Sequence, residues 1–83
     1  MAFKINYKPS VAKDLKGIPK KEISEMLDKA ESKLSADPHA FPKLKGEFKT
    51  LRKFRIGKYR IIYTINEQEV TILKIGHRKN IYR

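Results

Sequence analysis

Basic side chains that can bind phosphate gather in the second half of this sequence. Residues 43–83 carry twelve Lys or Arg against three Glu, a net charge of +9, whereas residues 1–42 carry a net charge of only +2. Every arginine lies in the second half. A planar guanidinium group forms paired hydrogen bonds with phosphate, while a lysine ammonium acts as a point charge. We therefore expect this half to attract nucleic acid, or an acidic protein partner, in a salt-dependent manner.

The composition of the 83 residues excludes several other kinds of chemistry. Without cysteine there is no disulfide framework, no thiol catalysis and no cysteine-ligated metal site. Two histidines are too few for a histidine metal cluster. Neither a metal nor an organic cofactor is indicated. No apolar run approaches the roughly 20 residues of a membrane span. We expect one cytoplasmic domain, residues 1–83, with no membrane contact.

The first half of the chain predicts one strand and two helices. Apolar residues alternate with polar ones over residues 3–7, which is typical of a half-buried strand. Ser10 suits the N-cap of a short helix, and Gly17 marks the end of that helix. The clearest helix spans residues 20–36, and Pro38 follows its end. Its apolar stripe consists of Ile23, Met26, Leu27, Ala30 and Leu34.

The second half predicts a loop and three strands. Proline and glycine mark a loop over residues 38–48, and strand-like runs follow near 50–56, 59–66 and 69–77. The predicted order is β-α-α-β-β-β. Two amphipathic helices need a sheet to cover their apolar stripes. The sequence therefore predicts an α+β fold in which a helical hairpin packs on one face of a four-stranded antiparallel sheet.

A two-residue turn at Gly57-Lys58, suited to type II′, fixes the register of the first hairpin. It sets Arg55 directly opposite Arg60, and Lys53 lies on the same face. Like charges that face each other directly destabilise a sheet, so this pair suggests an anion that relieves the repulsion, such as an RNA phosphate. The other face is apolar and carries Phe54, Ile56, Tyr59, Ile61 and Tyr63.

Regular pairing through the second hairpin extends the basic face to the last strand. With Ile65 opposite Val70, Ile75 falls opposite Arg60 and His77 joins the same face. This register predicts an apolar floor that basic side chains surround. It also places Lys74 on the core face, which is unfavourable for a charged residue and suggests that this strand is peripheral or bulged near its end.

Several stretches resemble the RelE/ParE toxin superfamily. The run Arg-Ile-Gly-Lys-Tyr-Arg-Ile-Ile-Tyr at 55–63 resembles the R-(V/I)-G-x-Y-R-(V/I)-(V/I)-Y core of that superfamily. The ending Ile-Gly-His-Arg-Lys-Asn-Ile-Tyr-Arg at 75–83 is similar to the V-G-H-R-x-x-(V/I)-Y-R tail of the RelE branch. The opening through residue 15, Asp37-Pro38 and Leu44-Lys45-Gly46 are also similar, so the resemblance covers essentially the whole chain.

The resemblance implies a single RelE-like toxin domain from a type II toxin–antitoxin pair. A RelE-type toxin is a ribosome-dependent endoribonuclease, or mRNA interferase. It cleaves mRNA in the A site by attack of the ribose 2′-hydroxyl and thereby inhibits translation. The partners implied are a RelB-like antitoxin, the 30S A site and mRNA, with DNA contact only through the antitoxin.

The resemblance also implies catalytic residues. Arg60 matches the arginine that stabilises the phosphate, and Lys53 matches a basic position implicated in catalysis. Arg78 matches a second functional arginine that serves as acid or charge clamp. Tyr82 matches a tyrosine that stacks on a base or assists proton transfer, although packing on the sheet is an equal alternative.

Three further residues are assigned to RNA binding: Arg52, Arg55 and His77. Arg55 follows from the register of the hairpin, and a structural role for His77 stays open. Two other functions remain as alternatives. One is a ParE-like inhibitor of DNA gyrase, which the shared core motif fits equally well. The other is a basic RNA-binding module without catalysis, which the basic face alone would support.

Overall fold

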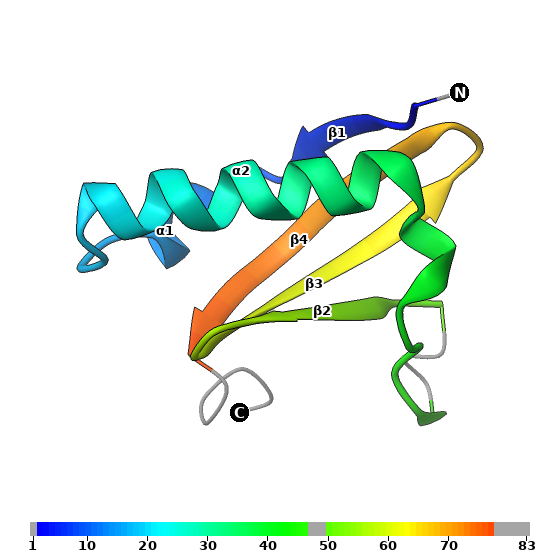
Figure 1. Cartoon of the computed structure of the whole chain (residues 1–83). Coiled ribbons are helices and arrows are strands. Elements are labelled where there is room, and N and C mark those ends of the chain that lie inside the picture. The colour runs from blue at the N-terminus through cyan, green and yellow to red at the C-terminus, as the bar shows by residue number, and fades with distance from the viewer. Residues whose placement is uncertain (1, 47–49, 78–83) are drawn as a thin grey trace.

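The structure is a computed structural model that describes residues 2–46 and 50–77. The strands form one sheet in the order β1-β4-β3-β2, and α2 lies across one face of it (Figure 1). The α+β class and the predicted order of the elements are confirmed. The elements are β1 (Lys4–Tyr7), α1 (Val11–Asp14), α2 (Lys20–Ala36), the 3-10 helix η1 (Pro38–Ala40), β2 (Arg52–Ile56), β3 (Tyr59–Asn66) and β4 (Glu69–His77).

The sheet is mixed, which corrects the predicted antiparallel arrangement. β2, β3 and β4 form the predicted antiparallel meander, but β1 pairs with β4 in parallel, with Ile5 opposite Val70. The helical connection explains the difference, because α2 returns the chain to the end of the sheet where β1 began. β1 and β2 therefore run the same way. Two hairpin reversals make β4 run that way too, so β1 is parallel to its neighbour.

The first helix is a single turn, so the predicted helical hairpin on the sheet face is wrong. α1 ends at Asp14, and the chain then turns through Gly17, whose φ of 86° is left-handed. Ser10 precedes the helix, but its side chain makes no capping hydrogen bond. Asp14 explains the placement of α1, because its Oδ2 accepts a hydrogen bond from the backbone N–H of Ile75 at 3.1 Å. α1 thus covers the edge of β4 beyond the end of β1.

α2 forms where the apolar stripe predicts it. Met26, Ala30 and Leu34 are buried at four-residue spacing, and the helix ends shortly before Pro38. Within the described residues, no helix is long and apolar enough to cross a membrane. Burying each large apolar side chain contributes about 1.5–3 kcal/mol. The buried residues that pack with this stripe are Val11, Phe54, Ile61, Tyr63, Val70, Ile72 and Ile75.

The β2–β3 hairpin has the predicted register. Arg55 pairs with Arg60, and Phe54 pairs with Ile61 on the face that α2 covers. Gly57 has a φ of 57°, as the first central residue of a type II′ turn requires.

A β-bulge changes the register of the second hairpin. Ile65 pairs with Val70 as predicted, but the pairing shifts between Ile62 and Tyr63 and leaves Leu73 without a partner in the ladder. One extra residue reverses the alternation of faces for the rest of the strand. The predicted register is therefore wrong beyond residue 72.

The bulge exchanges the faces of the residues that follow it. Ile75 lies opposite Ile61 on the helix side and is only 1% exposed, rather than opposite Arg60. Lys74 lies opposite Ile62 on the other side and is exposed. The bulge thus buries an isoleucine and releases a lysine, which is favourable because a buried unpaired charge is very costly.

The 3-10 helix is held to the sheet by Tyr63, whose hydroxyl donates a 2.6 Å hydrogen bond to the carbonyl oxygen of Pro38. The pKa of Tyr63 is raised to about 12, mainly because burial disfavours the charged phenolate. The nearby Arg52 lowers this pKa and Asp37 raises it.

We expect Tyr63 to make stability pH-dependent in alkaline solution. Because its folded pKa is raised above the usual 10.0, its contribution is complete below pH 10 and is lost as the pH rises toward about 12. Tyr63→Phe should cost about 1 kcal/mol at neutral pH by removing the hydrogen bond. Urea denaturation at pH 9 and pH 11 should show a shallower alkaline loss for this variant. Tyr59→Phe is the control, and an equally shallow loss there would contradict the assignment.

A second prediction concerns the edge of β4. Asp14→Ala removes the acceptor for the Ile75 N–H and should lower the free energy of unfolding by about 1 kcal/mol. Amide hydrogen exchange at Ile75 should accelerate more than exchange at Val70, which β1 covers. Asp14→Asn keeps an oxygen acceptor and should preserve most of the protection. Unchanged exchange in Asp14→Ala would show that this hydrogen bond does not hold the edge.

Candidate nucleic-acid interface

Four basic residues from three strands share the face of the sheet away from α2. Arg55 and Arg60 pair across β2 and β3, and Gly76 of β4 lies next to Arg60. Two positions along, Ile62 lies between Lys53 and Lys74. Neighbouring strands are about 4.8 Å apart and residues i and i+2 about 6.7 Å apart. The backbones of these four basic residues therefore lie within about 12 Å of one another. We call Lys53, Arg55, Arg60 and Lys74 the basic cluster.

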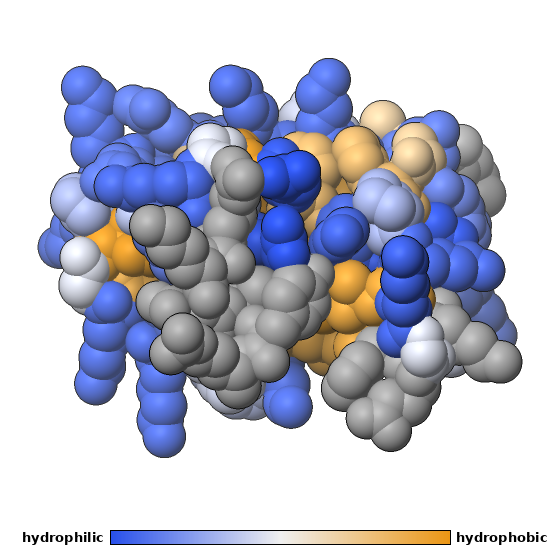
Figure 2. Space-filling model, turned by 90° about the horizontal axis from the view of Figure 1, so that it is seen from below, coloured by the Kyte–Doolittle hydropathy of each residue, from blue (hydrophilic) through white to orange (hydrophobic). Residues whose placement is uncertain are grey.

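The basic cluster surrounds a buried apolar residue. Ile62 is 5% exposed although it lies on the side away from α2. Lysine and arginine can cover apolar surface with their methylene stems and keep their charged ends in water. Gly76 lies beside Arg60 on β4 and adds no side chain to this face. Figure 2, the view from below, shows hydrophilic side chains next to separate areas of hydrophobic surface.

Three members of the basic cluster lack a nearby carboxylate in the part of the chain that the structure describes. Among the residues described, the one ion pair within 4.0 Å that involves a lysine joins Lys58 to Glu22 at 3.9 Å, at the hairpin tip. Lys53, Arg55 and Lys74 have no carboxylate at that distance in the described part of the chain. An anion is the natural counter-charge for such a group. The cluster can hold a phosphodiester and stabilise the extra negative charge of a phosphorane.

The structure separates the seven residues assigned from the sequence. Lys53, Arg55 and Arg60 come together as predicted. Arg52 and His77 lie on the opposite face. Arg78 and Tyr82 lie outside the described residues. Among residues 2–46 and 50–77, no three His, Asp or Glu side chains lie close enough together to hold a metal ion.

His77 and Arg52 both make contacts on the helix side. His77 is set opposite Tyr59 by the bulge, with ring centroids 6.3 Å apart at 75°. Arg52 pairs with Tyr63, and its Nη1 donates to the carbonyl oxygens of His39 at 3.1 Å and Phe41 at 2.7 Å. Arg52 therefore holds the end of η1 to β2.

Sequence reasoning missed Lys74 as a member of the basic cluster. The signal for it was present in the spacing of the apolar residues in β4. Val70 and Ile72 are two apart, but the next buried residue, Ile75, is three further on. Such a change from even to odd spacing indicates one extra residue in the strand.

The opposed arginines should lower stability when no anion is bound. Arg55→Thr removes the like-charge pair and places a β-branched residue at an exposed strand position. We expect the free energy of unfolding to rise by about 0.5 kcal/mol at low ionic strength. The gain should shrink in 0.5 M NaCl, because salt screens exposed charges. Chemical denaturation at two salt concentrations measures both values, and a less stable variant at low salt would refute the repulsion.

Comparison with known proteins agrees with this fold. The family model described as "ParE toxin of type II toxin-antitoxin system, parDE" matches residues 5–82. Toxin RelG of Mycobacterium tuberculosis is 29% identical over 86 residues, which cover 100% of this chain and 99% of that protein.

Two solved structures are also similar. The toxin–antitoxin complex RelBE2 from M. tuberculosis contains a chain with a TM-score of 0.85 and 25% identity, covering 94% of this chain and 100% of that one. The archaeal RelE–RelB complex from Pyrococcus horikoshii gives a TM-score of 0.71 and 28% identity, with 96% and 99% covered. The family match over nearly the whole sequence shows that this chain belongs to the ParE toxin family within the RelE/ParE superfamily, as a toxin of a type II toxin–antitoxin system.

Proposed function

We propose that this toxin is a ribosome-dependent endoribonuclease that cleaves mRNA in the A site and inhibits translation in the cytoplasm. The observation that carries the proposal is the pair Arg55 and Arg60, held directly opposite each other with Lys53 and Lys74 at their side. Like charges directly opposite each other repel, and an anion bound to both relieves that repulsion. The scissile phosphate of an RNA chain and the phosphates next to it supply this negative charge.

The proposed reaction is transfer of the phosphodiester to the ribose 2′-hydroxyl. The 2′-oxygen bonds to phosphorus as its proton passes to a base, and the bond to the 5′-oxygen breaks as that oxygen gains a proton. The products are a 2′,3′-cyclic phosphate and a free 5′-hydroxyl. Arg60 stabilises the phosphorane, and Arg55 binds a phosphate oxygen. Lys53 is the base that takes the proton of the 2′-hydroxyl.

Two residues outside the described part complete the proposed site. By the resemblance of the sequence, Arg78 supplies the proton to the 5′-oxygen or clamps its charge, and Tyr82 stacks on a base. These roles rest on the motif alone.

The need for the ribosome follows from the open form of the interface. Two pockets in the described part of the chain are lined by other residues, and neither includes Lys53, Arg55 or Arg60. A sheet surface can stabilise charge, but in-line attack also requires an RNA chain held in one conformation. In this proposal the 30S A site holds the mRNA and the toxin adds the charges.

We also propose a cognate RelB-like antitoxin as the resident partner. Two similar structures are toxin–antitoxin complexes, of M. tuberculosis and P. horikoshii. An acidic and apolar antitoxin segment would neutralise the basic cluster and block access to RNA. Contact with DNA would occur only through the antitoxin. The domain is proposed to span residues 1–83.

Inhibition of DNA gyrase is the second candidate. The observation that favours it is the matching family model, which is described as a ParE toxin. This function needs no nuclease site, so it leaves the Arg55–Arg60 pair unexplained. A supercoiling assay with purified gyrase distinguishes the two.

Removing Arg60 tests the catalytic proposal. Arg60→Ala should lower A-site cleavage on programmed ribosomes about 100- to 1,000-fold, because one preorganised charge contact to the transition state is lost. Arg60 and Arg78 substituted together should abolish growth arrest at equal protein abundance. Lys33→Gln changes an exposed lysine of α2 and is the control. Full cleavage by a folded Arg60→Ala protein would remove Arg60 from the mechanism.

Lys74 provides a separate test of the register. Lys74→Gln should lower cleavage about tenfold through the loss of one charged contact. The free energy of unfolding should change by less than about 0.5 kcal/mol, because the side chain is exposed. Primer extension on programmed ribosomes and urea denaturation give the two values. An effect no larger than that of Lys33→Gln would place Lys74 outside the RNA contact.

A further inference from the structure

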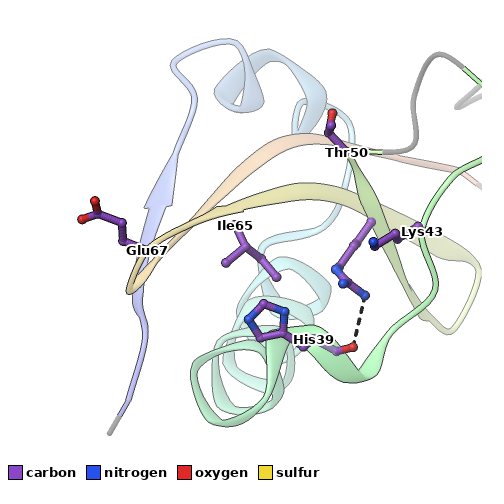
Figure 3. A pocket seen from close by; sticks show the side chains of 6 residues that line it. His39, Lys43, Thr50, Ile65 and Glu67 are labelled. Carbon is purple, nitrogen blue, oxygen red and sulfur yellow. Dashed lines mark hydrogen bonds between the residues drawn. The ribbon is translucent and has the colours of Figure 1, made fainter.

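A second basic site lies on the helix side of the sheet, near the end of η1. It is a pocket with a volume of about 810 Å³. Figure 3 shows it between η1, the segment that follows and the strands. Because Arg52 alternates with Lys53 along β2, this pocket and the basic cluster face opposite sides of the sheet. Its lining consists of His39, Lys43, Thr50, Arg52, Ile65 and Glu67.

One wall of the pocket carries two positive charges. The guanidinium group of Arg52 is fixed by its hydrogen bond to the carbonyl oxygen of His39, the dashed line in Figure 3, and by a second bond to Phe41. Lys43 pairs with Arg52 in an isolated bridge, which places their side chains next to each other. The amino group of Lys43 points into the pocket (Figure 3). A guanidinium held in one orientation loses little entropy when it binds an anion.

The charge on this wall is not neutralised inside the pocket. Within the described part of the chain, neither Lys43 nor Arg52 has a carboxylate within 4.0 Å. Glu67 lines the opposite side, and Figure 3 shows its carboxylate turned away from the pocket. The wall therefore favours an anionic group.

An aromatic ring and an aliphatic side chain also line the pocket. The ring of His39 and the side chain of Ile65 both point into it (Figure 3). The His39 ring also packs on Phe3, with centroids 5.8 Å apart at 71°, which holds its orientation. An aromatic ring beside an aliphatic side chain suits a planar heterocycle, because stacking on a base is worth about 1–3 kcal/mol.

We propose that this pocket binds a nucleoside phosphate. Lys43 and Arg52 bind the phosphate, and His39 and Ile65 hold the base. The volume of about 810 Å³ lies within the range of small-ligand sites, about 300–1,000 Å³. Two sources supply this chemistry: a free nucleotide, or one nucleotide of an RNA chain whose other part lies elsewhere on the protein.

A titration of the full-length, ¹⁵N-labelled protein tests the site. A nucleoside 5′-monophosphate, the matching nucleoside and inorganic phosphate are added in separate experiments. We expect saturable shifts at His39, Lys43 and Ile65 with the monophosphate, and affinities at least tenfold weaker for the other two. Equal affinity for inorganic phosphate would reduce the pocket to an anion site and overturn the proposal, as would absence of shifts there.

A pair of matched variants locates the phosphate. Lys43→Gln should weaken monophosphate binding about tenfold, the usual loss for one charged hydrogen bond. Lys45→Gln removes an exposed lysine two residues away that does not line the pocket, and its affinity should stay within twofold of the original. Equal losses in both variants would show attraction to net charge alone and would contradict a built site.

Short RNA identifies the source of the ligand. A trinucleotide that binds tenfold tighter than the monophosphate, with the same pocket shifts, points to RNA. Equal affinities point to the free nucleotide, and both results support the pocket. These experiments measure shifts at residues of the pocket, whereas the endoribonuclease proposal is tested by mRNA cleavage. If no nucleotide bound in the pocket, the endoribonuclease proposal would still stand. If the protein did not cleave mRNA, the proposed nucleotide site would still stand.

Discussion

The forced opposition of Arg55 and Arg60 is the constraint on which the proposed chemistry depends. Two features fix this pairing: the tight turn at Gly57 and the burial of Phe54 and Ile61 on the other face. Each buried side chain contributes about 1.5–3 kcal/mol, whereas the opposed charges cost at most about 1 kcal/mol. Burial therefore wins, and the hydrophobic core holds two cations side by side where an anion can use both.

The bulge at Leu73 in β4, the strand on the other side of β3, brings a further cation to the opposed arginines. It lets one strand bury Ile75 under the helix and present Lys74 to the basic cluster. The edge beyond β1 is then covered by α1 through Asp14. The core, the edge and the basic cluster are thus parts of one arrangement, in which small irregularities of β4 serve both packing and charge.

Local patterns predicted much of this molecule. The stripe of α2 and the turn at Gly57 were sufficient to place the helix, the first hairpin and three members of the basic cluster, because spacing alone decides which face a residue occupies. The parallel pairing of β1 depends on how the chain crosses the sheet, which no local pattern encodes. The bulge depends on competition between burial of Ile75 and exposure of Lys74. Arg52 lies on the face opposite the cluster, because adjacent residues of a strand point to opposite faces.

The most direct test of the central claim is a map of mRNA ends after the toxin is mixed with programmed ribosomes, with free mRNA and purified gyrase in parallel. The account predicts cuts confined to the A-site codon, each leaving a 2′,3′-cyclic phosphate and a 5′-hydroxyl, while free mRNA stays intact and supercoiling continues. Intact mRNA on the ribosome together with blocked supercoiling would contradict it and assign the toxin to gyrase.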